Sequence, residues 1–91
     1  MDLPQPNFFV YLLECRDKSL YCGYTNDLKA RVRLHNEGKA AKYTKPRRPV
    51  KLAYFEEKES KSEAMKREAW IKKMPRQEKI ALVASARAAK Q

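Results

Sequence analysis

Five side chains in this sequence have the chemistry needed to cleave a phosphodiester bond. They are two phenols, a guanidinium, an imidazole and a carboxylate, at Tyr11, Tyr21, Arg31, His35 and Glu68. Hydrolysis needs a base that takes a proton from water, a cation that neutralises charge on the phosphate, and a group that stabilises the leaving oxygen. A divalent cation bound by one carboxylate and several waters can meet the last two needs, and arginine binds phosphate through paired hydrogen bonds.

The rest of the composition argues against several other kinds of site. The chain has one histidine and no supporting motif for a Ser–His–Asp or Cys–His site, and its two glycines cannot build a phosphate-binding loop. No group of three His or Cys residues could hold zinc. Cys15 and Cys22 do not have metal-site spacing. We therefore expect buried free thiols, which fit a reducing compartment.

A tyrosine is a weak base unless its surroundings favour the phenolate. With a pKa of about 10, only about one-thousandth of a free phenol is ionised at pH 7. Nearby cations lower such a pKa, so we hypothesise that Arg31, a metal and a hydrogen-bonded His35 activate one tyrosine. Each residue also has a structural alternative. Strand tyrosines pack in cores, a helical arginine stays solvated or contacts phosphate, and His35 near a helix C-terminus complements the dipole.

The two tyrosines fall in a predicted β-hairpin. Residues 7–15 and 20–25 are rich in aromatic and branched side chains, and the polar run 16–19 joins them. Alternation divides the second strand into two faces, with Leu20, Cys22 and Tyr24 opposite Tyr21, Gly23 and Thr25. A glycine inside a strand marks a bulge or a close approach of another group. We expect Gly23 to leave room beside Tyr21.

Arg31 and His35 fall on a predicted helix that follows the hairpin. Thr25 or Asn26 can cap this helix, and Asp27 suits its first turn. The helix is expected to run to about residue 37, and Gly38 provides its C-terminal stop. Positions 28 and 32 should face the core. Arg31 and His35, which are also four residues apart, share a neighbouring stripe.

Glu68 falls on a second predicted helix. Ser60 and Glu63 match a capping box, and the helix should run from there to about residue 74. On a helical wheel Glu68 lies between Ala64 and Ile71, where a carboxylate is partly desolvated. Such an acid is costly unless it is paired or bound to a metal. The alternative is an ordinary solvated glutamate of a charged helix.

A third strand and a last helix complete the predicted order β-β-α-β-α-α. The strand is expected at about residues 50–56. Pro75 breaks the second helix and suits the first turn of a helix over Arg76–Ala88. The expected inner face of that helix comprises Ile80, Val83, Ala84 and Arg87. The tail, residues 86–91, should fray.

Length and charge favour a small domain with a polyanionic partner. The chain has 91 residues and a formal net charge of +10, which predicts one domain that attracts polyanions. This charge does not separate a nuclease from a ribosomal protein or a passive nucleic-acid binder. The N-terminus lacks the positive region of a signal peptide, and the apolar run "FFVYLL" is too short to span a bilayer. We expect a soluble, cytoplasmic protein without membrane partners.

Together these residues resemble the GIY-YIG nuclease superfamily, specifically its small standalone members. "FVYLLEC" lies at the first motif with Phe9 in place of glycine, and "YCGYT" lies at the second. "NDLKARVRLHN" resembles the helix that carries the catalytic arginine and a common histidine, at Arg31 and His35. "KREAW" resembles the helix with the metal-binding glutamate, at Glu68. The resemblance covers about residues 7–83, and the order and spacing of all these parts make it specific.

The resemblance implies an α/β (α+β) fold with a three-stranded antiparallel sheet flanked by about three helices. It implies hydrolysis of DNA with a single divalent cation, Mg²⁺ or Mn²⁺, bound by Glu68. Tyr11 and Tyr21 should converge near the metal. We expect Tyr11 to act as the base and His35 to tune it. Tyr21 would orient water or phosphate, and Arg31 would stabilise the transition state.

Nucleic-acid contacts are expected from one helix residue and from the basic loop that follows it. Residues 38–52 hold six basic residues and no acidic one. The candidates are Arg33, Lys39, Lys42, Lys45, Arg47, Arg48 and Lys51. Phosphate contacts position a protein without specifying sequence, so we expect weak sequence preference, with structure- or damage-directed cutting in DNA repair or recombination.

Two main interpretations remain open on the sequence alone, beside a purely structural or RNA-associated role. The first is a metal-dependent DNA endonuclease, and the second is a nucleic-acid-binding module of the same fold with little catalysis or with a need for a protein partner. DNA is a better candidate than RNA. All five site residues favour the enzyme. Several family nucleases also use a late asparagine, and the absence of any asparagine after Asn36 favours the binder.

Overall fold

The computed structural model describes residues 7–89 and confirms the predicted order of strands and helices. Two strands come first, β1 (Phe8–Glu14) and β2 (Leu20–Thr25), followed by α1 (Leu28–Asn36). A short 3-10 turn (Lys45–Arg47) interrupts the basic loop before β3 (Lys51–Lys58). Two helices complete the chain, α2 (Lys61–Lys72) and α3 (Arg76–Ala89).

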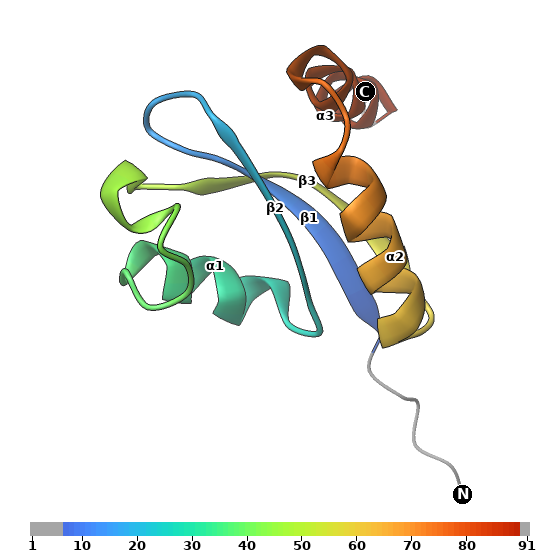
Figure 1. Cartoon of the computed structure of the whole chain (residues 1–91), viewed down its shortest axis with the longest axis horizontal. Coiled ribbons are helices and arrows are strands. Elements are labelled where there is room, and N and C mark those ends of the chain that lie inside the picture. The colour runs from blue at the N-terminus through green and yellow to red at the C-terminus, as the bar shows by residue number, and fades with distance from the viewer. Residues whose placement is uncertain (1–6, 90–91) are drawn as a thin grey trace, which may run out of the picture.

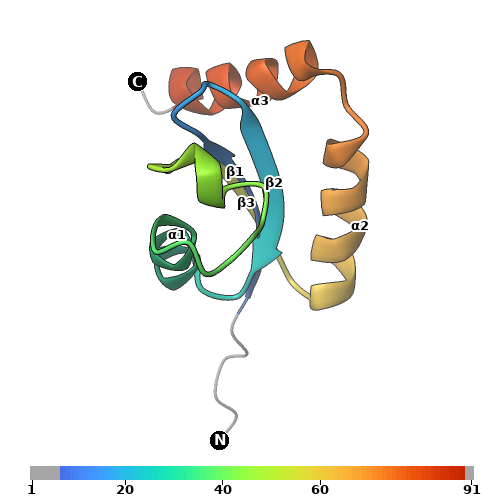
Figure 2. The same cartoon turned by 60° about the vertical axis from the view of Figure 1, so that its left-hand side comes forward.

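The three strands form one antiparallel sheet in the order β2-β1-β3. Helix α1 and the basic loop cover one face, α2 covers the other, and α3 lies across one end beside the β1–β2 turn (Figures 1 and 2). The central strand β1 therefore buries both of its faces. Val10 and Leu12 pack toward α2, whereas Tyr11 and Leu13 pack toward α1. This double burial explains why β1 is a continuous apolar run.

Helix α1 begins one or two residues later than expected. The N-cap is Asp27, whose Oδ1 accepts a hydrogen bond of 3.0 Å from the Ala30 amide. Thr25 instead accepts a hydrogen bond of 3.1 Å from the Asp27 amide and so orients the cap. The prediction of a Thr25 or Asn26 cap was wrong, because the aspartate reaches the free amides of the first turn. Gly38 follows the helix at φ 78°, as its role as a stop requires.

Helix α2 is capped and anchored as its polar pattern predicts. The Ser60 hydroxyl accepts a hydrogen bond of 3.1 Å from the Glu63 amide, which confirms the capping box. Arg67 donates two hydrogen bonds, of 2.9 and 2.8 Å, to the Glu56 carboxylate on β3. Burial alone would raise the pKa of Glu56, but hydrogen bonds from Arg67, Tyr54 and Lys58 outweigh it and lower the pKa to about 2. This contact holds α2 against the sheet.

Helix α3 packs differently from the prediction. Val83 is buried in the core, but Ile80 is 45 % exposed, and Ala84 and Arg87 are also exposed. The helix crosses the end of the sheet instead of lying flat on a face, so only part of its apolar stripe meets the core. The helix continues through Ala89, one residue beyond its expected end. Residues 90–91 and 1–6 lie outside the described part of the chain.

Cys15 and Cys22 are both buried free thiols, and burial raises the pKa of Cys22 to about 12. Phe9, at the position of the motif glycine, packs its ring edge-on against Phe55. Within residues 7–89, no helix is both long enough and apolar enough to cross a bilayer.

Candidate active site

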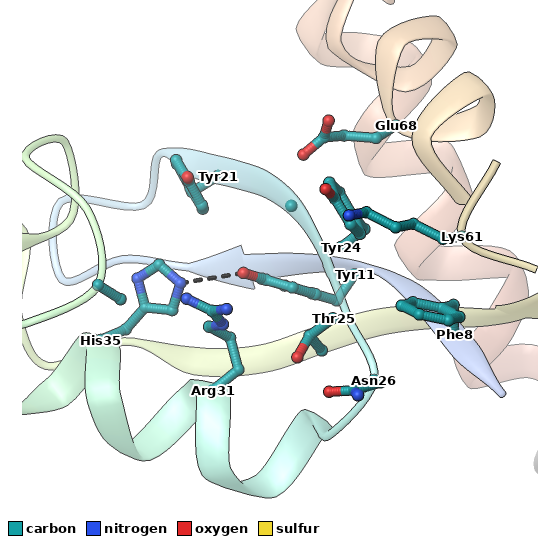
Figure 3. A pocket seen from close by; sticks show the side chains of 12 residues that line it. Phe8, Tyr11, Tyr21, Tyr24, Thr25, Asn26, Arg31, His35, Lys61 and Glu68 are labelled. Atoms are coloured by element: carbon teal, nitrogen blue, oxygen red, sulfur yellow. Dashed lines mark hydrogen bonds between the residues drawn. The ribbon is translucent and has the colours of Figure 1, made fainter. Parts of the chain in front are cut away.

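All five candidate residues line one open pocket of about 530 Å³ at the β2 edge of the sheet (Figure 3). They come from both layers of the fold. Tyr11 and Tyr21 stand on the sheet, Arg31 and His35 come from α1, and Glu68 comes from α2 on the opposite side. Because β2 is an edge strand, groups from the two faces can meet around it. The remaining lining residues are Phe8, Gly23, Tyr24, Thr25, Asn26, Ala40 and Lys61.

Gly23 makes room for Tyr11, not for Tyr21 as the sequence suggested. The antiparallel register places Tyr11 directly opposite Gly23. The Tyr11 ring lies across the glycine, so closely that a Cβ on Gly23 would come within 2.6 Å of Tyr11 Cζ. Any larger residue at this position would therefore force the Tyr11 ring to move. The prediction that another group comes close to Gly23 was right, but the predicted neighbour, Tyr21, was wrong. Alternation within one strand does not fix the register between two strands.

A chain of hydrogen bonds orients His35 toward Tyr11. The Thr44 hydroxyl donates to the Ala41 carbonyl at 3.3 Å, so its oxygen accepts a bond of 2.8 Å from His35 Nδ1. His35 Nε2 is then the acceptor for the Tyr11 hydroxyl, at 3.0 Å. His35 is 1 % exposed and Thr44 is fully buried. The neutral tautomer is thereby set, with its free lone pair facing the phenol.

The electrostatics of this pair differ from the prediction. Burial, followed by the nearby Tyr21, raises the pKa of Tyr11 far above its ordinary value, and the opposing effect of Arg31 is smaller. Burial and then the Arg31 charge lower the pKa of His35, which keeps the imidazole neutral. Arg31 lowers the Tyr11 pKa as expected, but desolvation of the phenolate outweighs the guanidinium, so the net shift is upward.

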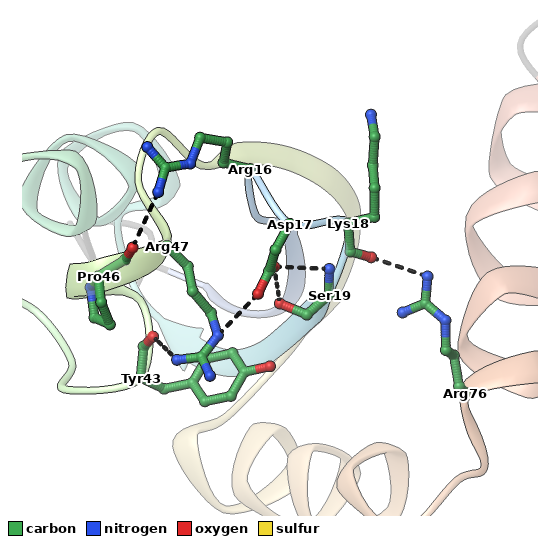
Figure 4. Close-up of polar contacts among 8 residues, drawn as sticks. All are labelled: Arg16, Asp17, Lys18, Ser19, Tyr43, Pro46, Arg47 and Arg76. Carbon is green, nitrogen blue, oxygen red and sulfur yellow. Dashed lines mark hydrogen bonds and ion pairs between the residues drawn. The ribbon is translucent and has the colours of Figure 1, made fainter.

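Tyr21 stands in a row of ring and guanidinium groups that runs from His35, which it meets edge-on, through Tyr43, on which it stacks, to the hairpin turn. Its ring centroid lies 5.2 Å from that of His35 and 5.9 Å from that of Tyr43. The Arg47 guanidinium covers the Tyr43 ring at 3.9 Å, donates to the Tyr43 carbonyl at 2.7 Å, and pairs with Asp17 at 3.1 Å (Figure 4). The row ties the basic loop to the turn between β1 and β2. Tyr21 is therefore fixed from outside the pocket.

Glu68 supplies a carboxylate that fits a divalent cation. Its side chain is 18 % exposed, and its carboxylate points into the pocket between α2 and the tyrosines (Figure 3). Lys72 Nζ lies 3.5 Å from Glu68 Oε2. Among residues 7–89 no group of three His, Cys, Asp or Glu could hold a metal. This donor set suits Mg²⁺, which keeps several waters and takes one or two carboxylates plus phosphate oxygens.

The predicted nucleic-acid contacts lie outside the pocket. None of the seven basic candidates lines it, although Ala40 of the same loop does. Four of the seven contact acids: Arg33 and Lys39 contact Glu37, Arg47 pairs with Asp17, and Lys51 pairs with Glu14. Arg48 donates to the Lys45 carbonyl at 2.7 Å. Their role in binding stays a prediction.

Three residues around the pocket were missed from the sequence. Thr44 and Tyr43 fall in the loop, where no local pattern distinguishes a buried hydroxyl from a surface one. Lys61 lines the pocket from the start of α2. It precedes Glu68 by seven residues, which places both on one helix face. That spacing could have identified Lys61.

The fold and the site together define an α+β domain of the nuclease type. Residues 7–81 match the GIY-YIG catalytic domain. The chain belongs to this family, whose nucleases generally use divalent metal ions and act on nucleic acid.

The chain is similar to other small proteins over most of their length. The chain is 53 % identical over 77 residues to a UPF0213 protein of Clostridium perfringens. The aligned residues make up 85 % of this chain and 83 % of that protein. It is 55 % identical to a UPF0213 protein of Staphylococcus haemolyticus, and the aligned residues make up 82 % of this chain and 92 % of that protein. A solution NMR structure of an E. faecalis protein is 38 % identical, with a TM-score of 0.62 and 92 % and 90 % of the chains covered.

Proposed function

We propose that this protein is a metal-dependent DNA endonuclease that hydrolyses phosphodiester bonds with low sequence specificity. One observation supports this most directly. The hydrogen-bonded pair Tyr11–His35 shares a pocket with a guanidinium, Arg31, and a carboxylate, Glu68, that come from opposite sides of the sheet. A purely structural tyrosine would not need an oriented neutral imidazole together with both kinds of charge.

In this proposal Tyr11 passes a proton from water to His35. Because burial raises the pKa of Tyr11, a free phenolate is a poor starting state. As water attacks phosphorus, its proton moves to Tyr11 Oη while the phenolic proton moves to His35 Nε2. The phenol stays neutral overall, and the new imidazolium keeps its Nδ1–H bond to Thr44. The neutral, buried imidazole is suited to accept that proton.

Arg31 and Glu68 act on the phosphate side of the reaction. Arg31 binds phosphate oxygens and offsets the charge that builds on them in the transition state. Glu68 would hold the cation, which when bound supplies Lewis-acid stabilisation of the phosphate and the leaving oxygen. Tyr21, fixed between His35 and Tyr43, orients water or phosphate within the pocket.

The substrate assignment rests on charge. The net charge of +10 favours a polyanion, and the exposed Lys42 and Lys45 have no acidic partner among the described ion pairs. Lysines of this kind contact phosphates and carry no sequence information. We therefore assign cutting directed by DNA structure or damage, as in repair or recombination, with DNA preferred over RNA.

The decisive experiment incubates purified protein with plasmid, single-stranded and branched DNA, with and without Mg²⁺ or Mn²⁺. We expect cleavage by the wild type only with metal, and a loss of at least about 100-fold in Glu68→Ala and Arg31→Ala, as when a transition-state contact is removed. Glu59→Ala and Lys29→Ala are matched controls, since both residues are exposed and lie outside the pocket. They should cut normally.

A nucleic-acid-binding module without catalysis is the second candidate. The contact of Lys72 with Glu68 favours it, because an ammonium already neutralises the carboxylate. DNA binding by the wild type without cleavage of any substrate would establish this alternative. Equal cleavage by Glu68→Ala would also refute the proposed mechanism.

A further inference from the structure

A second cleft continues the pocket along β2. It has a volume of about 310 Å³ and is lined by Leu20, Tyr21, Cys22, Tyr43, Lys72 and Lys79. The first pocket is lined by Tyr21 together with Gly23, Tyr24 and Thr25 of the same strand. The two clefts share Tyr21 and follow successive residues of one edge strand. They therefore form one groove along the β2 edge, which we call the β2 groove.

One wall of the β2 groove carries a row of lysines on either side of Glu68. Lys61, Glu68 and Lys72 are spaced by seven and four residues, so they share one face of α2, and Lys79 extends the row onto α3. Lys61 and Lys72 are eleven residues apart, a rise of about 16 Å along a helix. That distance corresponds to roughly five nucleotides at the rise of a B-DNA strand. Glu68 is the one acid among the lining residues of the groove.

Aromatic side chains line both sides of the groove, Phe8 and Tyr24 on the α2 side of the sheet and Tyr21 and Tyr43 on the α1 side. Phe8, Tyr21, Tyr24 and Tyr43 line the groove between the charged groups, and Tyr43 is 40 % exposed. Cations that follow a backbone, together with aromatic side chains that meet bases, are the pattern of proteins that bind single strands. Each cleft also has the volume of a pocket for a small ligand. A few nucleotides of one strand fit this space, whereas a double helix is far wider.

We propose that the β2 groove binds a single DNA strand, with Lys61 contacting phosphate on one side of the scissile bond and Lys72 and Lys79 contacting phosphates on the other. This inference rests on the proposed function for the place of the scissile phosphate. It assigns strand binding mainly to α2 and α3, in addition to the basic loop. A substrate must then be unpaired at the cut, as in a flap, a gap or a free end.

Binding in EDTA tests the groove without any cleavage. Fluorescence anisotropy of a labelled oligodeoxythymidylate is measured over a series of salt concentrations. Each phosphate contact that is lost should reduce the log–log salt slope by about 0.7. We therefore expect the double variant Lys61→Ala/Lys79→Ala to reduce the slope by about 1.4. The matched control is Lys66→Ala/Lys73→Ala, which removes the same charge from exposed positions outside the groove and should leave the slope nearly unchanged.

Two results would overturn the inference. An equal drop in slope for the control double variant would show that affinity follows net charge alone. Binding of a duplex of the same length as tightly as the single strand would show that no single-strand groove operates. The outcomes also separate the two proposals. A protein that binds as expected but never cuts with Mg²⁺ refutes only the proposed function, and a nuclease whose Lys61→Ala/Lys79→Ala variant keeps the wild-type slope refutes only the β2 groove.

Discussion

Tyr11 is the residue whose position depends most on its neighbours. It is 3 % exposed, pairs across the sheet with Gly23, and donates to His35. The glycine provides space, and the imidazole provides an acceptor. Neither contact is local in sequence. A substitution of Gly23 or His35 should therefore move or inactivate the phenol even though Tyr11 itself is unchanged.

Gly23→Ala should displace the Tyr11 ring. A Cβ within 2.6 Å of Tyr11 Cζ cannot be accommodated without movement of a buried side chain. We expect a loss of about 1–3 kcal/mol in the free energy of unfolding, as for overpacking, and lower cleavage activity. Urea unfolding measures the first effect. In a Tyr11→Leu background, Gly23→Ala should lower the free energy of unfolding much less. An equal loss in both backgrounds would contradict the proposed clash between the new Cβ and the Tyr11 ring.

Thr44→Val tests the orientation of His35. The valine keeps the shape of the side chain but removes the acceptor for His35 Nδ1–H. Activity should fall about 10- to 100-fold, the usual range for loss of an orienting partner, and the imidazole nitrogen shifts in NMR spectra should show mixed tautomers. Thr44→Ser restores the hydroxyl and should restore both readouts. A serine variant as impaired as the valine variant would indicate a packing role instead.

At the scale of elements, the position of Glu68 depends on how α2 sits on the sheet. The Arg67–Glu56 pair lies next to Glu68 and joins α2 to β3. On the other side of the sheet, the contacts that link Asp17, Arg47, Tyr43 and Tyr21 hold the basic loop against the hairpin turn. Arg76 at the start of α3 also donates a hydrogen bond of 3.0 Å to the Lys18 carbonyl (Figure 4). The two walls of the β2 groove are thus anchored separately.

Glu56→Gln should weaken the attachment of α2. A carboxylate with a folded-state pKa lowered from 4.5 to about 2 contributes stability above pH 4.5, and this contribution is lost as the pH falls toward 2. We expect a loss of about 1–3 kcal/mol at neutral pH, as when a charged partner is left unpaired. The stability of the variant should also vary less between pH 4.5 and 2. Chemical denaturation at several pH values checks both, and an unchanged pH dependence would rule out this role for Glu56.

At the scale of the whole molecule, charge decides how the protein meets its substrate. A net charge of +10 on 91 residues attracts any polyanion, whereas in our proposal the β2 groove selects which strand enters. Affinity and selectivity therefore have different origins. Added salt should weaken the affinity for DNA more than it weakens the preference for a single strand over a duplex.

The affinity of the wild type for single-stranded DNA should fall steeply with salt. Three phosphate contacts at about 0.7 each give a log–log slope near −2.1, or roughly a 20-fold loss over a fourfold rise in salt. Further contacts from the basic loop would steepen this. Anisotropy titration in EDTA measures the slope. A slope near zero would show that binding does not depend on phosphate contacts.

The local patterns of the sequence determined a large part of this structure. Apolar runs and alternation predicted the strands, the Ser60–Glu63 pair predicted the start of α2, and the order of elements followed. Hydrogen bonds and burial that repeat over a few residues leave such patterns in the chain itself. The five candidate residues were also identifiable from their chemistry and spacing together with the family resemblance.

Only the tertiary structure decided which groups meet. The strand register placed Gly23 under Tyr11 instead of Tyr21, loop packing brought Thr44 to His35, and the crossing of α3 left Ile80 exposed and brought Lys79 to the β2 groove. These contacts join segments distant in sequence. They depend on the sum of packing over the whole core, and no short window of residues contains that sum.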